Sequence, residues 1–217
     1  MDDPVDSLAE LEANLRDIAL ANRFLGGISP VARIIERVGA KSVLDVGCGA
    51  ADVPRAILTS ARRRGHDLEI TCLDRSEQML AIASRDAGGM SFLRGDATAL
   101  PFADASFDVA TCCLALHHFV REDAIRALRE LRRVSRLTAV VCDLRRSALA
   151  YAGARALSLF TSNRLTRHDA PISVLRAYTP QEALTLARAA GWQHARARTE
   201  PWFRMILTDE SAAVRGR

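Results

Sequence analysis

The sequence predicts an α/β protein built on a mostly parallel β-sheet with helices on both faces. Three observations support this prediction. Apolar strand-like runs alternate with helical patterns over residues 43–143, which is the order of elements in a parallel sheet. The first run leads directly into a glycine turn, and the last two runs, beyond Gly191, form the pattern of an antiparallel hairpin. With 217 residues, of which 49% are hydrophobic, the chain suits a single domain over residues 1–217.

Two helices are expected before the first strand. Residues 5–25 are amphipathic, with apolar side chains spaced by three and four positions at Leu8, Leu11, Leu15 and Ile18. Ser29 and Pro30 suit the cap and first turn of a second helix that runs to Val38. We therefore expect residues 1–40 to form an N-terminal helical cap.

The first strand and the turn after it are the most informative part of the chain. Residues 43–46 are mostly apolar and β-branched, as in a parallel strand that is covered on both faces. Gly47 and Gly49 follow on either side of Cys48, and glycine permits positive φ and a close approach of a ligand. Open α/β sheets build nucleotide sites at this place, the carboxyl end of the first strand.

An acidic residue stands at the end of the second strand. Residues 68–73 form the strand pattern, and Asp74 follows directly. A carboxylate at this position can accept two hydrogen bonds from a ribose diol. The alternative is that Asp74 caps the helix that begins near Ser76, and the two roles are compatible.

The remaining elements continue the alternation. Helices are expected over Asp52–Arg64, Glu77–Arg85 and Arg121–Val134, and a fifth strand over Leu137–Asp143. Thr179 and Glu182 form the pattern of a capping box at the start of a late helix, which ends at Gly191. The closing hairpin is expected over residues 192–199 and 202–208.

Residues 144–178 interrupt this rhythm and predict a helical lid inserted after the fifth strand. A helix is expected over Ala148–Phe160, followed by a polar loop over residues 161–171. Long insertions of this kind are usually functional, and this one should lie at the carboxyl edge of the sheet.

The glycine turn resembles motif I of the class I S-adenosylmethionine-dependent methyltransferases. The dinucleotide pattern requires a third glycine where Asp52 stands, whereas motif I departs only at Ala51, its last glycine. The resemblance extends over residues 43–143. Residues 92–102 resemble the third strand and its loop, residues 105–113 the fourth strand, and Leu116-His117-His118-Phe119 the small-molecule branch, of the methyltransferase type 11 or quinone-biosynthesis kind.

This resemblance implies a Rossmann-like, seven-stranded sheet and S-adenosyl-L-methionine as the cofactor. Asp96 would accept from the adenine amine, and the Ala97 amide would meet the ring nitrogen. Arg75 either lies along the adenine or ribose or has a surface role. Asp45 would hold the methionine amino group or only brace the turn. The full set of expected cofactor residues is Asp45, Gly47, Cys48, Gly49, Asp74, Arg75, Asp96, Ala97, Cys112 and Cys113.

Three histidines are candidate general bases. Methyl transfer needs alignment of the nucleophile, and it needs a base only when that nucleophile arrives protonated. His117 and His118 follow the fourth strand at the mouth of the site, where they act as bases or only cap and pack. His168 stands beside Asp169 in the lid, either as an oriented base or as part of a polar loop.

Arginines are the other polar candidates near the site. Arg164 and Arg167, in the lid, either hold an acidic or phenolate group of the acceptor or are solvated. Arg23 and Gly27 are expected to close over the methionine carboxylate of the cofactor.

These residues predict methylation of a small molecule, on an oxygen of a phenolic, quinone or polyketide-like acceptor. A carbon nucleophile on a quinone-like ring and a non-catalytic binding protein of the same fold are the alternatives. Residues 112–115 lack the Asn/Asp-Pro-Pro-Tyr motif of enzymes that methylate base amines, and the chain lacks interleaved aromatic residues, so nucleic acid is not expected.

Composition sets the remaining expectations. None of the five cysteines forms a Cys-x-x-Cys pair, so we expect buried free thiols and no metal. The net charge is +4, and arginine supplies nearly all of the positive charge. The chain has no long apolar run and no secretory pattern at its start, which favours the cytoplasm and no membrane span. A small-molecule acceptor is the expected partner, and a homodimer is compatible with the sequence.

Overall fold

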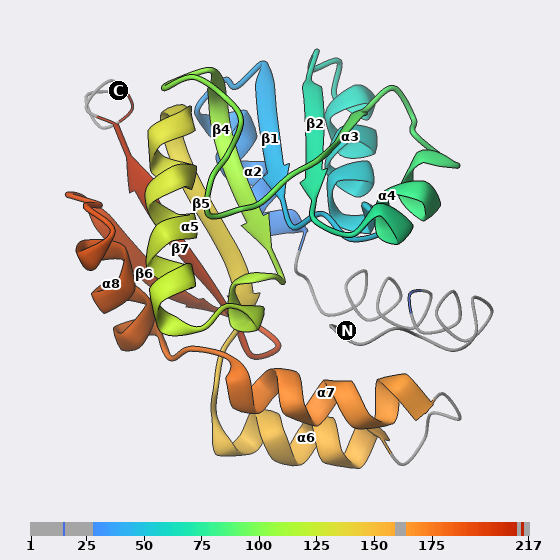
Figure 1. The fold of residues 1–217 in the computed structure, drawn as a ribbon, viewed down its shortest axis with the longest axis vertical. Coiled ribbons are helices and arrows are strands. Elements are labelled where there is room, and N and C mark those ends of the chain that lie inside the picture. Colours follow the sequence, from blue (N-terminus) through green and yellow to red (C-terminus); the bar gives the residue numbers. More distant parts are fainter. Residues whose placement is uncertain (1–14, 16–27, 159–163, 212–213, 215–217) are drawn as a thin grey trace.

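The computed structural model describes residues 15, 28–158, 164–211 and 214, and its centre is one seven-stranded sheet in the order β3-β2-β1-β4-β5-β7-β6 (Figure 1). All neighbouring strands are parallel except β7, which is antiparallel to both β5 and β6. The strands are β1 Ser42–Val46, β2 Glu69–Asp74, β3 Ser91–Arg94, β4 Phe107–Cys113, β5 Ser135–Leu144, β6 Ala195–Glu200 and β7 Arg204–Glu210. The predicted α/β fold and its closing hairpin are confirmed.

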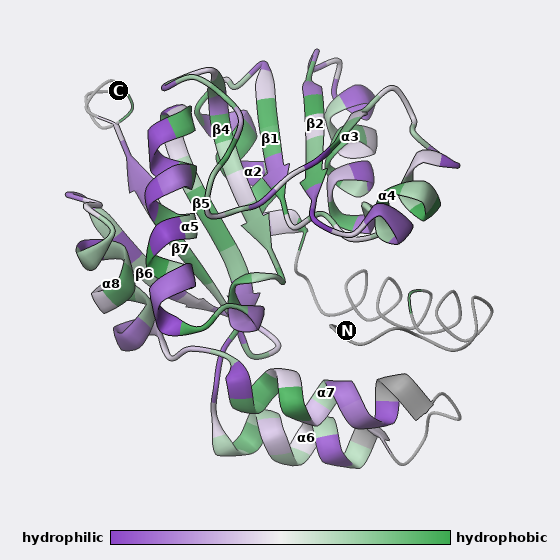
Figure 2. Cartoon of the chain, in the orientation of Figure 1, coloured by the Kyte–Doolittle hydropathy of each residue, from purple (hydrophilic) through white to green (hydrophobic). Residues whose placement is uncertain are grey.

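Helices cover both faces of this sheet. They are α2 Ser29–Arg37, α3 Asp52–Arg63, α4 Glu77–Ser84, the short 3₁₀ helix η1 Leu116–His118, α5 Arg121–Val134, α6 Ala148–Ser158, α7 Arg164–Arg176 and α8 Pro180–Ala189. Val43 packs into one core with residues of α2 and α3, while Leu44 packs into a second core with residues of α5 and α8. In Figure 2 the central strands are mostly apolar, and the outer face of α5 is hydrophilic.

The helix boundaries confirm one predicted cap and correct another. Thr179 and Glu182 form the capping box of α8, with the Glu182 amide donating to Thr179 Oγ1 at 3.3 Å. In α2, however, the capping residue is Ile28 and no side chain caps the helix, so Ser29 is the first helical residue. The helix expected over residues 5–25, together with Arg23 and Gly27, lies outside the described residues except for residue 15.

The insertion after β5 consists of two helices that pack against each other, α6 and α7, and α7 also contacts η1. Figure 1 shows this pair beyond the edge of the sheet where β4 and β5 end. The polar loop predicted over residues 161–171 is wrong for residues 164–171, which belong to α7. Polar composition and Pro171 suggested a loop, but packing of α7 on α6 and η1 outweighs these local preferences.

A membrane-spanning helix would need a long apolar stretch. No helix in the described part of the chain is long and apolar enough to cross a bilayer.

Candidate functional site

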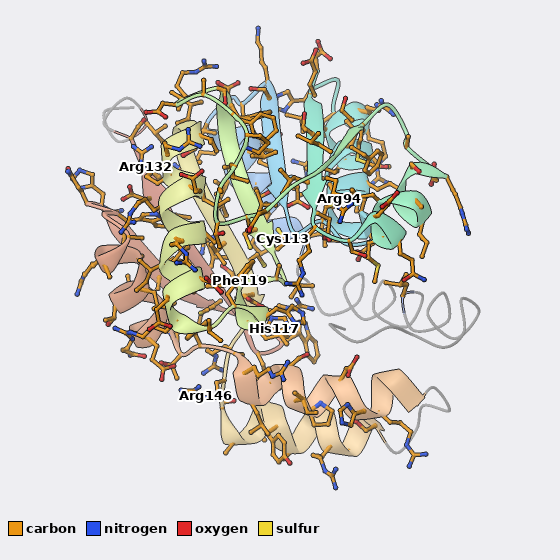
Figure 3. All side chains as sticks on the ribbon, viewed as in Figure 1. Arg94, Cys113, His117, Phe119, Arg132 and Arg146 are labelled. Carbon is orange, nitrogen blue, oxygen red and sulfur yellow. The ribbon has the colours of Figure 1, made fainter. Side chains whose placement is uncertain are left out.

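The candidate site lies at the carboxyl edge of the sheet, because β1, β2, β4 and β5 are parallel and end on the same side. The segments that leave these strands are the glycine turn, the α4 entry, η1 and the α6–α7 insertion. In Figure 3, Cys113 and His117 lie along the edge that faces α6 and α7. The fold therefore gathers most of the predicted residues at one edge.

The glycine turn is held against β2 and packed against the segment after β4. The amides of Gly47 and Cys48 both donate to the Leu73 carbonyl, at 2.8 and 3.2 Å. Gly47 has φ +72°, and a Cβ built on it would lie 2.7 Å from the Cβ of Ala115. Gly49 has φ +53° with no atom within 4 Å of such a Cβ. Gly47 is therefore required by packing, whereas Gly49 leaves open space beside the backbone.

Ala51 occupies the position of the last glycine in motif I and adopts the conformation of a glycine. Its φ is +60°, it precedes α3, and its side chain is buried. A left-handed conformation costs a residue with a side chain about 1–2 kcal/mol. The departure at Ala51 thus preserves the course of the turn at an energetic cost.

Asp74 connects the end of β2 to the glycine turn. Its Oδ2 accepts from the Gly49 amide at 2.8 Å, and its Oδ1 accepts from the Ser76 amide at 2.9 Å. The residue that caps α4 is Ser76, whose Oγ accepts from the Met79 amide at 3.3 Å, so the capping alternative for Asp74 is wrong. Each carboxylate oxygen has a second lone pair, so Asp74 retains acceptor capacity toward a ligand.

Asp45 is a buried carboxyl group at the end of β1. It is 2% exposed, and its Oδ1 accepts from Thr111 Oγ1 at 2.6 Å. Burial raises the pKa of Asp45 to about 7, and the negative charges of Asp52 and Asp74 act in the same direction. Among the described residues, Asp45 has no ion-pair partner. A cationic group placed beside it would compensate its buried charge.

The residues expected at the adenine end lie next to Asp74. The Gly95 amide donates to the Asp74 carbonyl at 3.0 Å, which brings the loop after β3 to the tip of β2. Asp96 is exposed, and its Oδ1 accepts from the amide and the hydroxyl of Thr98, both at 2.8 Å. These hydrogen bonds lower the pKa of Asp96. Ala97 is half-buried and Arg75 is exposed.

The cysteines of the chain are structural in character. All five are buried thiols outside any disulfide, as the sequence predicts. Burial raises the pKa of both Cys112 and Cys113, so these residues at the end of β4 are neutral thiols. Cys112 packs with the core under α5, and Cys113 with the core under α3. Across the described ranges, no group of three or more metal-ligating side chains is close enough to hold an ion.

His117 forms a buried pair with Asp143. The His117 amide donates to Asp143 Oδ2 at 2.9 Å, and His117 Nδ1 lies 2.7 Å from Asp143 Oδ1. The two side chains are 5% and 1% exposed. Burial alone would raise the pKa of Asp143, but the charge and hydrogen bonds of His117 and the Leu144 amide hold it below its usual value. Asp143 is therefore ionised, and Nδ1 of His117 is the donor.

Sequence reasoning did not single out Asp143. It was noted only as the last residue of the fifth strand. Because β4 and β5 are parallel neighbours, a residue that ends β5 lies beside the segment that follows β4. The signal was an acidic residue at the carboxyl end of one strand and a histidine just after its neighbour.

The other two histidines have different surroundings. His118 is exposed, and its ring centroid lies 4.2 Å from that of His117. The His168 side chain is 75% exposed on α7, with Nδ1 3.2 Å from Asp169 Oδ1. Arg167 is exposed as well, and the side chain of Arg164 lies outside the described set. The structure thus places one of the three candidate bases, His117, in a buried hydrogen-bonded pair.

Comparison with known proteins supports the interpretation of residues 43–138. This segment matches a family described as "Methyltransferase domain". The chain is 41% identical over 104 residues to a demethylmenaquinone methyltransferase of Thermotoga maritima, covering 48% of this chain and 43% of that protein. It is 42% identical over 97 residues to a malonyl-(acyl-carrier protein) O-methyltransferase of Erwinia pyrifoliae, covering 45% and 34%. The chain spans less than half the length of both relatives.

Solved structures extend the similarity of fold to nearly the whole chain. The plantazolicin methyltransferase BpumL, solved in complex with SAH, superposes with a TM-score of 0.74 and covers 97% of this chain and 91% of its own. At 14% identity this likeness shows the fold alone. Residues 43–138 thus match the methyltransferase domain family, and the relatives support a class I S-adenosylmethionine-dependent methyltransferase.

Proposed function

We propose that this protein transfers the methyl group of S-adenosylmethionine to an oxygen of a small phenolic, quinone or polyketide-like acceptor. The observation that carries this proposal is the buried His117–Asp143 pair at the carboxyl edge of the sheet. A base in this place is useful for an acceptor that arrives as a hydroxyl and must lose its proton.

The residues of the turn fit the cofactor. Asp45 is a buried carboxyl without an ion-pair partner among the described residues, which suits the ammonium of the methionine part. Gly49 leaves open space beside the backbone, and Asp74 joins this turn to the start of α4, with Oδ2 accepting from the Gly49 amide and Oδ1 from the Ser76 amide. Asp96 and Ala97 would hold the adenine. When bound, the cofactor supplies a methyl group already activated by a positive sulfur.

The chain itself supplies a positioned base. Asp143 accepts from Nδ1 of His117 and fixes the ring orientation, so Nε2 is the atom that takes the proton from the acceptor hydroxyl. The ionised Asp143 then stabilises the imidazolium that results. General base catalysis of this kind contributes roughly 10²–10⁴-fold to the rate.

The part of the chain outside the family match would select the acceptor. That match ends at residue 138, before the α6–α7 insertion begins. The two relatives described above carry names with different acceptors, which fits a shared cofactor half and a divergent acceptor half. The names of the demethylmenaquinone methyltransferases favour one alternative, methylation of a ring carbon on a quinone-like acceptor.

Two measurements test this proposal in sequence. Calorimetry with S-adenosylhomocysteine first asks whether the cofactor site is functional, and absence of binding at high micromolar concentration would favour a non-catalytic protein of this fold. Incubation of the holoenzyme with phenolic and quinol acceptors and isotope-labelled cofactor follows. The chemical shift of the transferred methyl group distinguishes O-methyl from C-methyl products.

A further inference from the structure

The turn between β6 and β7 holds two bulky aromatic residues in an unusual conformation. Glu200 pairs with Arg204 across the hairpin, and residues 201–203 form the turn. Trp202 and Phe203 both have φ +58°. Tight hairpin turns that require positive φ ordinarily use glycine or asparagine. Strained backbone of this kind is concentrated at functional sites.

This turn lies at the same sheet edge as the His117–Asp143 pair. Asp143 is opposite Met205 in the β5–β7 ladder, and the ladder continues beyond β5, because the Arg145 amide donates to the Phe203 carbonyl at 2.7 Å. Arg145 is two positions beyond Asp143, a span of about 7 Å in extended backbone. Figure 1 shows β7 beginning at the edge that faces α6 and α7.

The two tryptophans of the chain have opposite surroundings. Trp192 is 2% exposed, and its indole N–H donates to the Leu128 carbonyl at 2.8 Å. Trp202 is 60% exposed, although its backbone is strained. The core therefore does not account for Trp202. In the first turn of α6, Leu149 is also exposed, at 69%.

Arg145 supplies a polar group beside this turn. Its Nε is buried and has no hydrogen-bond partner among the described residues. A buried donor normally has a partner in the functional state of a protein, and an acceptor oxygen of a ligand would provide one. The backbone of Arg145 thus pairs with the residue next to the exposed Trp202, and Arg145 follows Asp143 by two positions in the chain.

We propose that Trp202 is a specificity-determining residue, whose indole stacks on a planar aromatic ring of the acceptor while Arg145 holds an anionic oxygen of the same molecule. The assignment to the acceptor rests on the proposed methyl transfer. The recognition chemistry itself does not, because stacking and charge-assisted hydrogen bonding depend only on these two side chains.

The test uses a pair of fluorinated probes that differ in planarity. Binding of 4-(trifluoromethyl)benzoate and of trans-4-(trifluoromethyl)cyclohexanecarboxylate to the full chain is measured by ¹⁹F NMR. We expect the aromatic acid to bind roughly 2- to 10-fold more tightly than the saturated acid. Trp202→Ala should abolish that preference, and Trp202→Phe should retain most of it. Arg145→Met should weaken the benzoate about tenfold but leave 4-(trifluoromethyl)benzyl alcohol unchanged.

Two controls keep the outcome decisive. Leu93→Ala, which changes an exposed apolar residue on β3 at the far edge of the sheet, should bind both probes as the wild type does. Trp202→Gly should melt at the same or a higher temperature, because glycine relieves the positive φ. A lower melting temperature would indicate a structural role for the indole and overturn the proposal.

Other results would also overturn it. Equal binding of both acids by the wild type, or unchanged binding in Trp202→Ala, would remove the stacking role. A change of molecular mass in Trp202→Ala by sedimentation would assign the indole to an interface between copies. Calorimetry with S-adenosylhomocysteine separates this proposal from the previous one, since Trp202→Ala should bind it normally. If the wild type does not bind S-adenosylhomocysteine, that result contradicts the proposed methyl transfer but not the proposed role of Trp202.

Discussion

Asp45 is a single buried carboxyl group that, in the proposed function, holds the ammonium of the cofactor, so its protonation should control cofactor binding. Its pKa rises from 3.8 to about 7 because the side chain is buried. A cationic ammonium is held well by the ionised form and poorly by the neutral form. We therefore expect the affinity for S-adenosylhomocysteine to rise as the pH increases through about 7, and to lose this dependence in Asp45→Asn. Calorimetry between pH 5.5 and 8.5 measures both.

The same shift in pKa predicts a change in stability with the opposite sign. An acid with a raised folded-state pKa contributes most stability below its unfolded value of 3.8, and that contribution is lost as the pH rises to about 7. At pH 8, Asp45→Asn should therefore raise the free energy of unfolding of the cofactor-free protein, by on the order of 2–4 kcal/mol. Urea unfolding at pH 8 and pH 4.5 measures this. An equal effect at both values would contradict the buried charge.

The His117–Asp143 pair predicts a loss of turnover that is separable from cofactor binding. Asp143→Asn removes the charge that orients the His117 ring and stabilises its protonated form, so kcat should fall roughly 10²-fold or more. Cofactor affinity should change little. Asp169→Asn is the matched control, because the His168 ring that it contacts is 75% exposed. Similar losses in both variants would argue against His117 as the base.

At the scale of elements, the glycine turn separates a packing role from a binding role. Gly47→Ala would place a methyl group 2.7 Å from the Ala115 Cβ at a positive φ, and should destabilise the fold by about 2–4 kcal/mol. In Gly49→Ala the new methyl group meets no neighbouring atom, so the fold should lose only about 1–2 kcal/mol through backbone strain. The loss of cofactor affinity should be larger than in Gly47→Ala. Thermal unfolding and calorimetry give the two readouts. Ala51→Gly should leave stability within about 1 kcal/mol, since relieved strain offsets the loss of a buried methyl.

The sequence predicts the elements that local patterns determine and misses those that depend on tertiary contacts. The β-branched runs before Gly47 and Asp74 identify their strands locally, because those strands are buried on both faces. Residues 164–171 were misassigned because polar residues and Pro171 favour a loop, while the helix depends on contacts with α6 and η1. Asp143 was missed as a partner of His117 because their proximity arises from the pairing of β4 with β5, which no local pattern encodes.

At the scale of the whole molecule, the proposed function divides the chain into a cofactor half and an acceptor half. The family match covers β1 to the start of β5, and the strained Trp202 turn and the α6–α7 insertion lie beyond it. The sequence predicts the first half well, because its motifs bind a constant ligand. It predicts less of the second half, because the acceptors named for the relatives differ. There the candidate residues are identified by their solvent exposure and backbone strain, which only the structure shows.

The insertion is built so that its removal should leave the rest of the fold intact. Its ends are already adjacent, because the Arg146 amide donates to the Tyr178 carbonyl at 3.3 Å and the Arg146 side chain pairs with Glu182. The α6 and α7 helices pack mainly on each other, with a smaller contact to η1. Replacing residues 148–176 with a short Gly-Ser linker should therefore keep binding of S-adenosylhomocysteine within about threefold, a change below 1 kcal/mol. Methyl transfer to any acceptor should be lost, because we propose that α6 and α7 form a lid that excludes water from the His117 edge. A variant that unfolds, or that retains turnover, would show that α6 and α7 are not a separable acceptor lid.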